Sequence, residues 1–454
     1  MGRNMKKYRH EVKDPIHAFI RFDDDERKII NSAPFQRLRH IHQLSLSYLV
    51  YPGATHKRFE HSLGVMELAG RAFDTITNPD KIGSDEHDLL SNHVDLNNPS
   101  QLQYWRRALR IAALCHDMGH LPFSHAAENR LFPEGWDHER MTREIILRSE
   151  IKDILVNLMT PPINPEDVVK LAIGQKHAPD LDFNDWEALL SEIIVGDAFG
   201  VDRMDYLLRD SYHSGLVHGK FDHYRLIDTL RIMTPPAENE NGDKSMEPSL
   251  GVEEGGLVTS EALLLSRYFM FTQVYFHPVT KIYDLHLADF LVDGRNGAHF
   301  PTNPDDYIKI TDNEIMAGIL SASNDTSAVG HENAQRIINR NHMRVLYQRY
   351  QSDIDLNPNA VEVVKNAIQE KYGEDVTKYY QMPPKGKPSD FLVYRNDSCI
   401  DRALNLSKVI ANIPTPECEI IYIDKSLLDE AKKWLATNRI SIINTGTEEK
   451  NDKE

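Results

Sequence analysis

Cysteine is scarce in this sequence. The chain has 454 residues and only 3 cysteines, Cys115, Cys399 and Cys418, at unrelated spacings. This number excludes a disulfide-stabilised scaffold and a zinc ribbon, because both need several cysteines at paired positions. Free thiols are typical of a reducing compartment.

Long apolar runs are also lacking. Residues 1–13 are polar and basic, and no stretch reaches the ~18 apolar residues of a membrane helix. Lys6 stands where the myristoylation pattern needs Ser or Thr. These absences predict a cytoplasmic protein without a membrane partner.

Positive charge is in deficit, with 52 Lys and Arg against 69 Asp and Glu and a formal net charge of −17. Polynucleotides and anionic membranes are bound by clustered positive charge, so polynucleotide binding is not expected as the main role. A small phosphorylated ligand held by a few local cations remains compatible with this balance.

Histidine, in contrast, is abundant, with 21 residues against 16 Phe and 4 Trp. Hydrophobic residues make up 41% of the chain and charged residues 27%, which is an ordinary globular balance. Because imidazole is both a metal ligand and an acid or base near neutral pH, the excess draws attention to where the histidines lie.

Helical periodicity dominates the first part of the chain, with apolar residues at i, i+3 and i+4 over residues 25–228. Asn241-Gly242 predicts a hairpin between strands 230–234 and 250–252. The predicted fold is mainly α, with a large helical core, a small β-hairpin and a smaller C-terminal α/β lobe. The predicted domains are a core at 1–300 with the hairpin insertion at 231–255, a helical extension at 301–380, an α/β lobe at 381–446 and a disordered tail at 447–454.

The C-terminal third is expected to contain both element types. Helices are predicted at 260–292, 333–350, 360–372 and 427–436. Short strands are predicted at 391–394, 420–423 and 440–443, where β-branched and aromatic residues cluster.

His116 continues an apolar helical stripe and should therefore point toward the core; the stripe comprises Leu102, Trp105, Leu109 and Ala112. A lone inward-facing histidine is most often a hydrogen-bonded core residue. Asp117 adjoins it, however, and burying a carboxylate beside an imidazole is costly unless a cation pairs with both. The doublet therefore favours a metal site.

His61 also faces inward, and Asp202 begins a carboxylate-bearing helical face. Two imidazoles and two carboxylates make a mixed nitrogen and oxygen site that suits Fe, Mn, Co, Ni or Zn. A zinc pair formed by His116 and His120, as in the HExxH proteases, is the competing interpretation. That motif needs Glu where this chain has Asp117, which makes the interpretation weaker.

The order of these residues resembles a known family. Residues 58–65, the His116-Asp117 doublet and Asp202 are similar to the H…HD…D signature of the HD-domain phosphohydrolases. Four further blocks resemble the deoxynucleoside triphosphate (dNTP) triphosphohydrolases within that group: DPIH at 14–17, FQRLR at 35–39, YPGA at 51–54 and HDMGHLPFSH at 116–125. The likeness is strong over residues 14–210, weaker over 267–277 and faint after residue 360.

The resemblance implies a metal-dependent hydrolase that releases deoxynucleoside and inorganic triphosphate through attack of water on the α-phosphorus. It assigns a divalent ion (Mn, Fe, Co, Ni, Zn or Mg) to His61, His116, Asp117 and Asp202. His125 and Glu128 match the catalytic pair, and the carboxylate would favour a protonated His125 as general acid. The resemblance places His120 and His138 at the α-phosphate.

Substrate contacts also follow from the resemblance. Arg58, Arg203 and Arg267 match phosphate-binding positions. The matches to sugar-binding positions are Tyr206, Asp210, Gln43, Leu44 and Tyr275, with Asp210 accepting the 3′-hydroxyl hydrogen bond. Phe271 and Phe276 depart from the vertebrate pattern, which leaves affinity and base preference open.

A regulatory nucleotide site is implied by matches at Lys13, Asp14, Gln36 and Arg39. Asn31 stands where the family has a carboxylate that accepts the two N–H donors of guanine. We therefore expect guanine-specific activation to be weak or absent. The family also implies a homo-oligomer, with a tetramer favoured.

Two other functions remain open on sequence grounds. Another HD phosphohydrolase would act on nucleoside monophosphates, alarmones or phosphodiesters, but it would not need three phosphate-binding arginines. A non-catalytic nucleotide sensor would not need to keep all four ligand positions together with His125 and Glu128.

Overall fold

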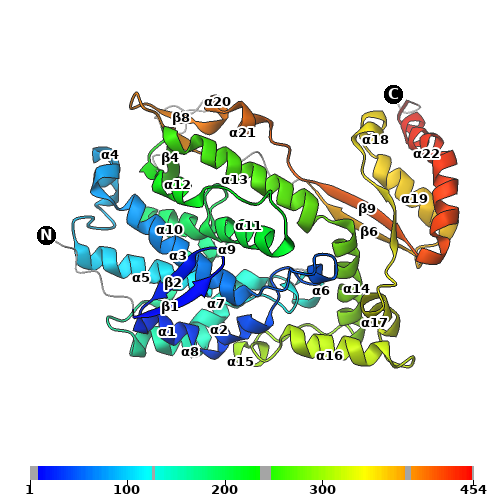
Figure 1. Cartoon of the computed structure of the whole chain (residues 1–454), viewed down its shortest axis with the longest axis horizontal. Coiled ribbons are helices and arrows are strands. Elements are labelled where there is room, and N and C mark those ends of the chain that lie inside the picture. Colours follow the sequence, from blue (N-terminus) through cyan, green and yellow to red (C-terminus); the bar gives the residue numbers. More distant parts are fainter. Residues whose placement is uncertain (1–8, 125–127, 236–246, 384–389, 452–454) are drawn as a thin grey trace. The chain divides into compact units, whose positions relative to one another are not determined.

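The structure is a computed structural model that describes residues 9–124, 128–235, 247–383 and 390–451 (Figure 1). The chain divides into two compact units. The first comprises Met1–Met270, His299–Ile315 and Pro388–Pro414, and the second comprises Phe271–Ala298, Met316–Lys387 and Thr415–Glu454. The fold is mainly helical, as predicted.

The centre of the first unit is helix α3 (Arg58–Ile76), which packs against α5 (Pro99–Cys115) and α11 (Val201–Ser214). Helices α9 (Pro165–His177) and α10 (Asp185–Val195) complete the packed group. Local chemistry sets the ends of these helices. The Asn98 side chain accepts from two backbone N–H groups ahead of Pro99 at the start of α5, and Gly215 ends α11 at a φ of 73°.

Smaller elements surround this group. The first unit also contains α1 (Asp24–Ile30), α2 (Ala33–Arg37), α4 (Ser84–Leu90), α6 (Glu128–Leu131), α7 (His138–Arg148), α8 (Glu150–Asp153), α12 (His223–Asp228), α13 (Leu257–Met270), α15 (Pro304–Tyr307), α20 (Ala403–Leu406) and α21 (Lys408–Asn412). Helix α16 (Asp312–Ser323) begins in the first unit and ends in the second.

Two sheets belong to the first unit. Strands β1 (His10–Asp14) and β2 (Ala18–Phe22) form an antiparallel hairpin. The predicted later hairpin is confirmed as β3 (Leu230–Met233) paired with β4 (Ser249–Glu253), and most of its turn lies outside the described residues. Strand β4 pairs in parallel with β7 (Leu392–Tyr394), which pairs with β8 (Ile400–Arg402).

The second unit contains a sheet in the order β5-β9-β6, formed by β5 (Arg344–Gln348), β9 (Cys418–Ile423) and β6 (Thr377–Met382). Helices α19 (Ala360–Tyr372) and α22 (Leu428–Asn451) share a hydrophobic core with it. The unit also has α14 (Pro278–Gly294), α17 (His331–Ile338), α18 (Gln351–Leu356) and the short π-helix η7 (Phe271–Tyr275). Residues 381–446, predicted as one lobe, are therefore divided between the two units.

Four predicted segments differ from the structure. The helix expected at 333–350 ends at Ile338, and strand β5 follows it. The strand expected at 440–443 is helical, because Ile443 continues the buried helical face begun by Ala431 and Leu435. The helix expected at 260–292 is broken before Pro278, which lacks a backbone N–H and starts α14. Helix α22 also continues to Asn451, into the segment expected to be a disordered tail.

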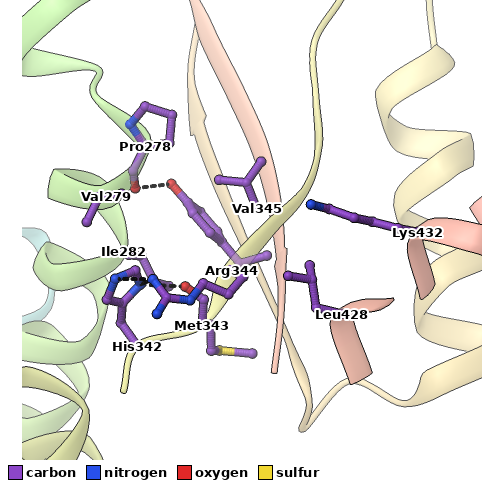
Figure 2. Close-up of a pocket in the computed structure, with 10 residues that line it drawn as sticks. Pro278, Val279, Ile282, His342, Met343, Arg344, Val345, Leu428 and Lys432 are labelled. Atoms are coloured by element: carbon purple, nitrogen blue, oxygen red, sulfur yellow. Dashed lines mark hydrogen bonds between the residues drawn. The ribbon is translucent and has the colours of Figure 1, made fainter. Parts of the chain in front are cut away.

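A small cavity of about 220 Å³ opens in the second unit (Figure 2). Its walls are mostly apolar, and Arg344 donates to His342 at one side (2.7 Å between Nη1 and Nε2). It contains none of the residues predicted for catalysis or metal binding. Among the described residues, no helix combines the length and hydrophobicity needed to cross a membrane.

Candidate metal centre and active site

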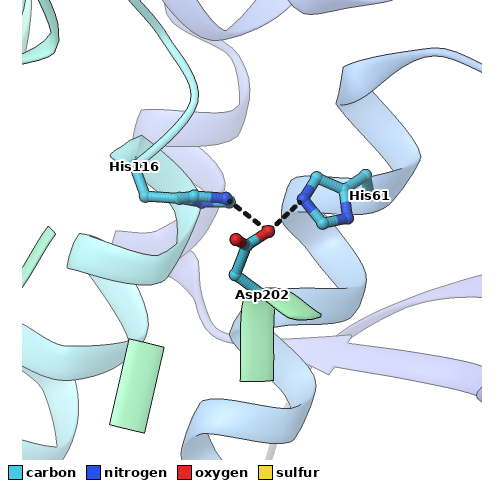
Figure 3. Close-up of side chains that lie close together, drawn as sticks. All are labelled: His61, His116 and Asp202. Atoms are coloured by element: carbon cyan, nitrogen blue, oxygen red, sulfur yellow. Dashed lines mark hydrogen bonds and ion pairs between the residues drawn. The ribbon is translucent and has the colours of Figure 1, made fainter. Parts of the chain in front are cut away.

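Three predicted metal ligands meet at one point of the first unit (Figure 3). His61 lies in the first turn of α3, His116 follows the last residue of α5, and Asp202 lies in the first turn of α11. The Oδ1 atom of Asp202 is 3.0 Å from Nε2 of His61 and 3.4 Å from Nε2 of His116. The helix ends therefore bring two imidazoles to one carboxylate oxygen.

Asp117, the fourth predicted ligand, faces the same cluster. Its Oδ2 atom is 3.5 Å from Nε2 of His61, and its Oδ1 atom is 3.4 Å from Nε2 of His116. Arg58 donates to Oδ2 of Asp117 at 2.5 Å, and this contact holds the carboxylate in place. All four predicted ligands thus lie together, with only Asp202 substantially exposed, at 33% of its side chain.

The electrostatics of the cluster suit a cation. Burial opposes a charge on His61, but its hydrogen bonds to Asp202 and Asp205 outweigh burial and raise its pKa to about 10. Burial likewise opposes ionisation of Asp202, yet its hydrogen bonds to His116 and His61 hold its pKa well below the usual range. Without a metal, a proton on His61 thus supplies positive charge between the ligand atoms.

The hydrogen bonds of the two imidazoles also fit a metal. Nδ1 of His61 bonds to Asp205 at 2.8 Å and Nδ1 of His116 bonds to the Ala113 carbonyl at 2.7 Å, which turns both Nε2 atoms toward Asp202. Nε2 of His116 is buried, and it faces the Asp117 and Asp202 carboxylates at 3.4 Å each. Two imidazoles and two carboxylates therefore form a donor set that fits a divalent transition-metal ion.

Asp205 is a site residue that the sequence analysis missed. It lies one helical turn after Asp202, and this spacing was its only available signal. Its contact with His61 joins residues 144 positions apart, which no local pattern reveals.

A second group lies beside the metal ligands. The rings of His120 and His138 stack with centroids 3.9 Å apart, and Nε2 of His120 is 3.2 Å from Oδ1 of Asp117. Glu128 accepts from the backbone N–H of His138 at 2.8 Å and lies 2.7 Å from its Nδ1 atom. His125 lies outside the described residues, so the predicted pairing of His125 with Glu128 stays a prediction.

The environment shifts the pKa values of the stacked histidines in opposite directions. Burial, followed by the charges of Arg58 and His138, holds the pKa of His120 well below its usual value. Burial also disfavours a charged His138, but its hydrogen bond to Glu128 raises its pKa overall. The two imidazoles that stack next to the metal ligands therefore have pKa values shifted in opposite directions.

Two predicted phosphate-binding arginines, Arg203 and Arg267, are close enough to influence each other. Burial and then the charge of Arg203 lower the pKa of Arg267, and both guanidinium groups interact with Tyr206. Nε of Arg203 is buried without a hydrogen-bond partner in the described residues. Arg58, by contrast, is committed to Asp117 and to Ser124 (3.0 Å from Nε to Oγ). Two neighbouring arginines that repel each other form a suitable place for an anion.

The predicted sugar-binding residues belong to both units: Gln43, Leu44, Tyr206 and Asp210 lie in the first, and Tyr275 lies in the second. Gln43 donates its backbone N–H to the His56 carbonyl, and His56 bonds to Asp210 with 2.8 Å between Nε2 and Oδ1. Oδ1 of Asp210 therefore already has a protein partner. Oε1 of Gln43 is buried and has no hydrogen-bond partner among the described residues, and Leu44 is half-buried beside it. Tyr275 lies on η7, in the second unit.

The predicted regulatory residues lie near the chain start. Lys13 and Asn31 are exposed, while Gln36 accepts a hydrogen bond at Oε1 from Nε of Arg39 (2.9 Å). Asp14 differs, because it is 4% exposed and bonds to Arg209 at 2.8 Å. Its carboxylate belongs to the interior.

Comparisons with known proteins agree with this geometry. Residues 58–210 match the HD domain and residues 221–385 match the HD associated region. Over 366 residues the chain is 33% identical to an uncharacterized protein of Bacillus subtilis, covering 76% of this chain and 72% of that protein. The chain belongs to the HD-domain phosphohydrolase family.

Two further relatives define the extent of the likeness. A deoxynucleoside triphosphate triphosphohydrolase of Bos taurus is 30% identical over 344 residues, covering 68% of this chain and 54% of that enzyme. The HD-domain chain thus spans about half the length of that relative. The crystal structure of a hypothetical protein from Aquifex aeolicus matches with a TM-score of 0.72 and 30% identity, covering 94% of this chain and 99% of that one.

Proposed function

We propose that this protein hydrolyses dNTPs to deoxynucleoside and inorganic triphosphate. The observation that carries the proposal is the arrangement of His61, His116, Asp117 and Asp202 beside the stacked His120 and His138 rings. The likeness to a vertebrate dNTP triphosphohydrolase supports it. A divalent ion at the four ligands would activate water for attack on the α-phosphorus.

The protein's own side chains would bind and orient the substrate. His138, whose pKa the hydrogen bond to Glu128 raises against the effect of burial, would offer a hydrogen bond to an α-phosphate oxygen, and His120 would contact the same phosphate. Arg203 and Arg267 would neutralise the distal phosphates, which relieves their mutual repulsion. His125 remains the proposed donor of the proton to the leaving 5′-oxygen.

Gln43 is the structure-based candidate for sugar recognition. Its buried Oε1 atom needs a donor, and a 3′-hydroxyl would supply one. Leu44 beside it would crowd a 2′-hydroxyl and so favour deoxyribose. Asp210 would then act with His56 rather than as an isolated carboxylate.

Other properties remain proposals drawn from the family resemblance. The donor set favours Fe, Mn, Co, Ni or Zn over Mg, because Mg binds oxygen ligands in preference to imidazole. From the same resemblance we propose that the protein forms a homo-oligomer, with a tetramer favoured, and that it is cytoplasmic. We also propose that the exposed Asn31 weakens activation by guanine nucleotides.

A substrate panel tests the proposed function. Purified protein is supplied with each candidate metal and incubated with the four dNTPs, alone and in mixtures, with the matching ribonucleotides, and with a monophosphate, an alarmone and a phosphodiester. We expect triphosphate and deoxynucleoside from dNTPs only. Turnover of a monophosphate, an alarmone or a phosphodiester in place of dNTPs would favour another HD phosphohydrolase, and binding without turnover would favour a sensor.

A further inference from the structure

A buried network stands behind the metal ligand His61. Asp205 on α11 is 0% exposed, and its Oδ2 atom accepts from Nδ1 of His61 at 2.8 Å. Its Oδ1 atom is 2.6 Å from Nε2 of His17. Arg209, one turn further along α11, donates to both oxygens at 2.8 and 2.9 Å. Four hydrogen bonds therefore fix this carboxylate.

The network extends to the β1–β2 hairpin. Nη1 of Arg209 donates to Oδ2 of Asp14 at 2.8 Å. Oδ1 of Asp14 accepts from the backbone N–H groups of Ile16 and His17, both at 2.9 Å, which closes the turn between the two strands. Asp14 and His17 thus attach the hairpin turn to Arg209 and Asp205.

Gly64 makes room for the network. It lies on α3 one turn after His61, where α3 packs against α11. A Cβ atom at this position would lie 1.9 Å from Oδ1 of Asp205 and 2.7 Å from Nη2 of Arg209. Any side chain at residue 64 would therefore displace the carboxylate that contacts His61.

We propose that Asp205 is a positioning residue that sets the ring orientation of His61, and that the β1–β2 hairpin takes part through His17 and Asp14. When an ion is bound, a carboxylate on Nδ1 would keep the remaining ring proton there and leave the Nε2 lone pair, on the side of Asp202, for the ion. This inference rests on the proposed metal site. It adds a role for the N-terminal strands, which contribute no metal ligand themselves.

The substitution Asp205→Asn tests the role directly. Because Arg209 donates to both carboxylate oxygens, the amide NH₂ group of Asn would face a donor in either orientation. We expect Mn²⁺ affinity, measured by calorimetry on the full chain, to fall about 10- to 100-fold, as is usual when a ligand loses its orienting partner. The visible spectrum of the Co²⁺-loaded protein should also change, because it reports ligand geometry.

A matched control is the buried pair of Glu26 and Arg110, with 2.5 Å between Oε1 and Nε. Glu26→Gln removes the same kind of charge from beside an arginine, but Glu26 contacts no predicted metal ligand. We expect this variant to lose stability while keeping its Mn²⁺ affinity. Equal affinity losses in both variants, or none in Asp205→Asn, would overturn the proposal.

A pair of glycine substitutions covers the case in which Asp205→Asn does not fold. Gly64→Ala and Gly70→Ala both add a methyl group to α3 against a buried arginine, and the Cβ at residue 70 would lie 2.7 Å from Nη1 of Arg110. We expect only Gly64→Ala to weaken Mn²⁺ binding. Equal affinities in the two variants would contradict the inference.

The part played by the hairpin has its own test. His17→Gln should weaken Mn²⁺ binding, though less than Asp205→Asn does, and unchanged affinity would remove the hairpin from the proposal. Because Mn²⁺ affinity is measured without substrate, the positioning role of Asp205 and the proposed dNTP hydrolysis are tested independently of each other. A wild-type protein that binds Mn²⁺ but cleaves no dNTP would refute the proposed function alone.

Discussion

Asp202 brings the two histidines together because its carboxylate lies where three helix ends converge. His61 and His116 direct Nε2 toward it, since their Nδ1 atoms are occupied by Asp205 and by the Ala113 carbonyl. Each of the two histidine ligands is thus oriented by a group that is not itself a predicted metal ligand. Single substitutions at these residues should therefore change metal binding and turnover.

His116→Ala is the first residue-scale prediction. The variant loses an imidazole whose Nε2 makes only long contacts of 3.4 Å with Asp117 and Asp202, so folding should be retained. Turnover should fall by more than about 100-fold, beyond the 10- to 100-fold typical when a group that only orients a metal ligand is changed. Steady-state kinetics and circular dichroism check both parts, with His87→Ala as the control. Unchanged turnover would refute the site assignment.

The second residue-scale prediction concerns the substitution Gln43→Ala. If Oε1 accepts the sugar 3′-hydroxyl, the substitution should lower kcat/KM for a dNTP about 3- to 10-fold, the worth of one neutral hydrogen bond. It should leave kcat/KM for the 2′,3′-dideoxy analogue nearly unchanged, since that substrate has no hydroxyl to donate. Measuring kcat/KM for wild type and Gln43→Ala with each of the two substrates gives the coupling between the Gln43 side chain and the 3′-hydroxyl. Equal losses for both substrates would show that Gln43 acts on something other than the 3′-oxygen.

Local spacing explains which site residues could be predicted. His61 and His116 lie on apolar helical faces, and the neighbouring Asp117 marks the doublet. Asp205 and His56 carry no such mark, because their partners lie 144 and 154 residues away. Asp14 illustrates the same limit, since its buried contact with Arg209 spans 195 residues.

At the scale of elements, local patterns predicted four of the described strands correctly and failed at residues 440–443. Ile440–Ile443 has strand-like composition, yet Ile443 lies on the buried face of α22 with Ala431 and Leu435, and this packing decides its structure. The parallel pairing of β4 with β7 joins segments about 140 residues apart, which no local signal indicates. Packing on the buried face of α22 and the missing backbone N–H of Pro278 therefore account for two of the elements that were predicted wrongly.

The junction of α14 with β5 gives an element-scale prediction. His286 is buried, its Nε2 accepts from the Met343 N–H at 3.3 Å, and its Nδ1 faces Asn333. Burial, with the charges of Arg336 and Lys378, lowers its pKa to about 3. As pH falls from about 6.5 toward 3, the unfolded chain takes up a proton that the folded chain refuses, so stability should drop by up to ~1.4 kcal/mol per pH unit.

Urea unfolding of wild type and His286→Gln at pH 7, 6 and 5 isolates this contribution. The difference in free energy of unfolding between the two proteins should narrow as the pH falls, because Gln takes up no proton. Parallel stability curves would mean that His286 does not titrate in this range.

For the whole molecule, the net charge of −17 disfavours a broad polynucleotide surface but not a phosphate substrate. In the proposed function, the groups that would bind the phosphates are local: Arg203, Arg267 and His138. A bound metal ion would add to them and reverse the field in the site.

Metal removal tests the whole-molecule account. Because the ligands come from three helices, a bound ion should raise the thermal midpoint of the entire first unit. The expected stabilisation is about 2.7 kcal/mol when the free ion is at 100 times its Kd. Differential scanning calorimetry after chelation and after Mn²⁺ addition measures it, with His116→Ala as a control that should not respond. A wild-type midpoint insensitive to metal would contradict the site.

The central claim is that water attacks the α-phosphorus of a dNTP at this centre. Hydrolysis of a dNTP in ¹⁸O-enriched water, followed by phosphorus-31 NMR of the phosphorus product and mass spectrometry of the deoxynucleoside, tests it most directly. The account predicts inorganic triphosphate as the first phosphorus product, carrying one ¹⁸O atom, with no label in the deoxynucleoside. Orthophosphate or pyrophosphate as the first product, or label at the deoxynucleoside 5′-oxygen, would contradict it.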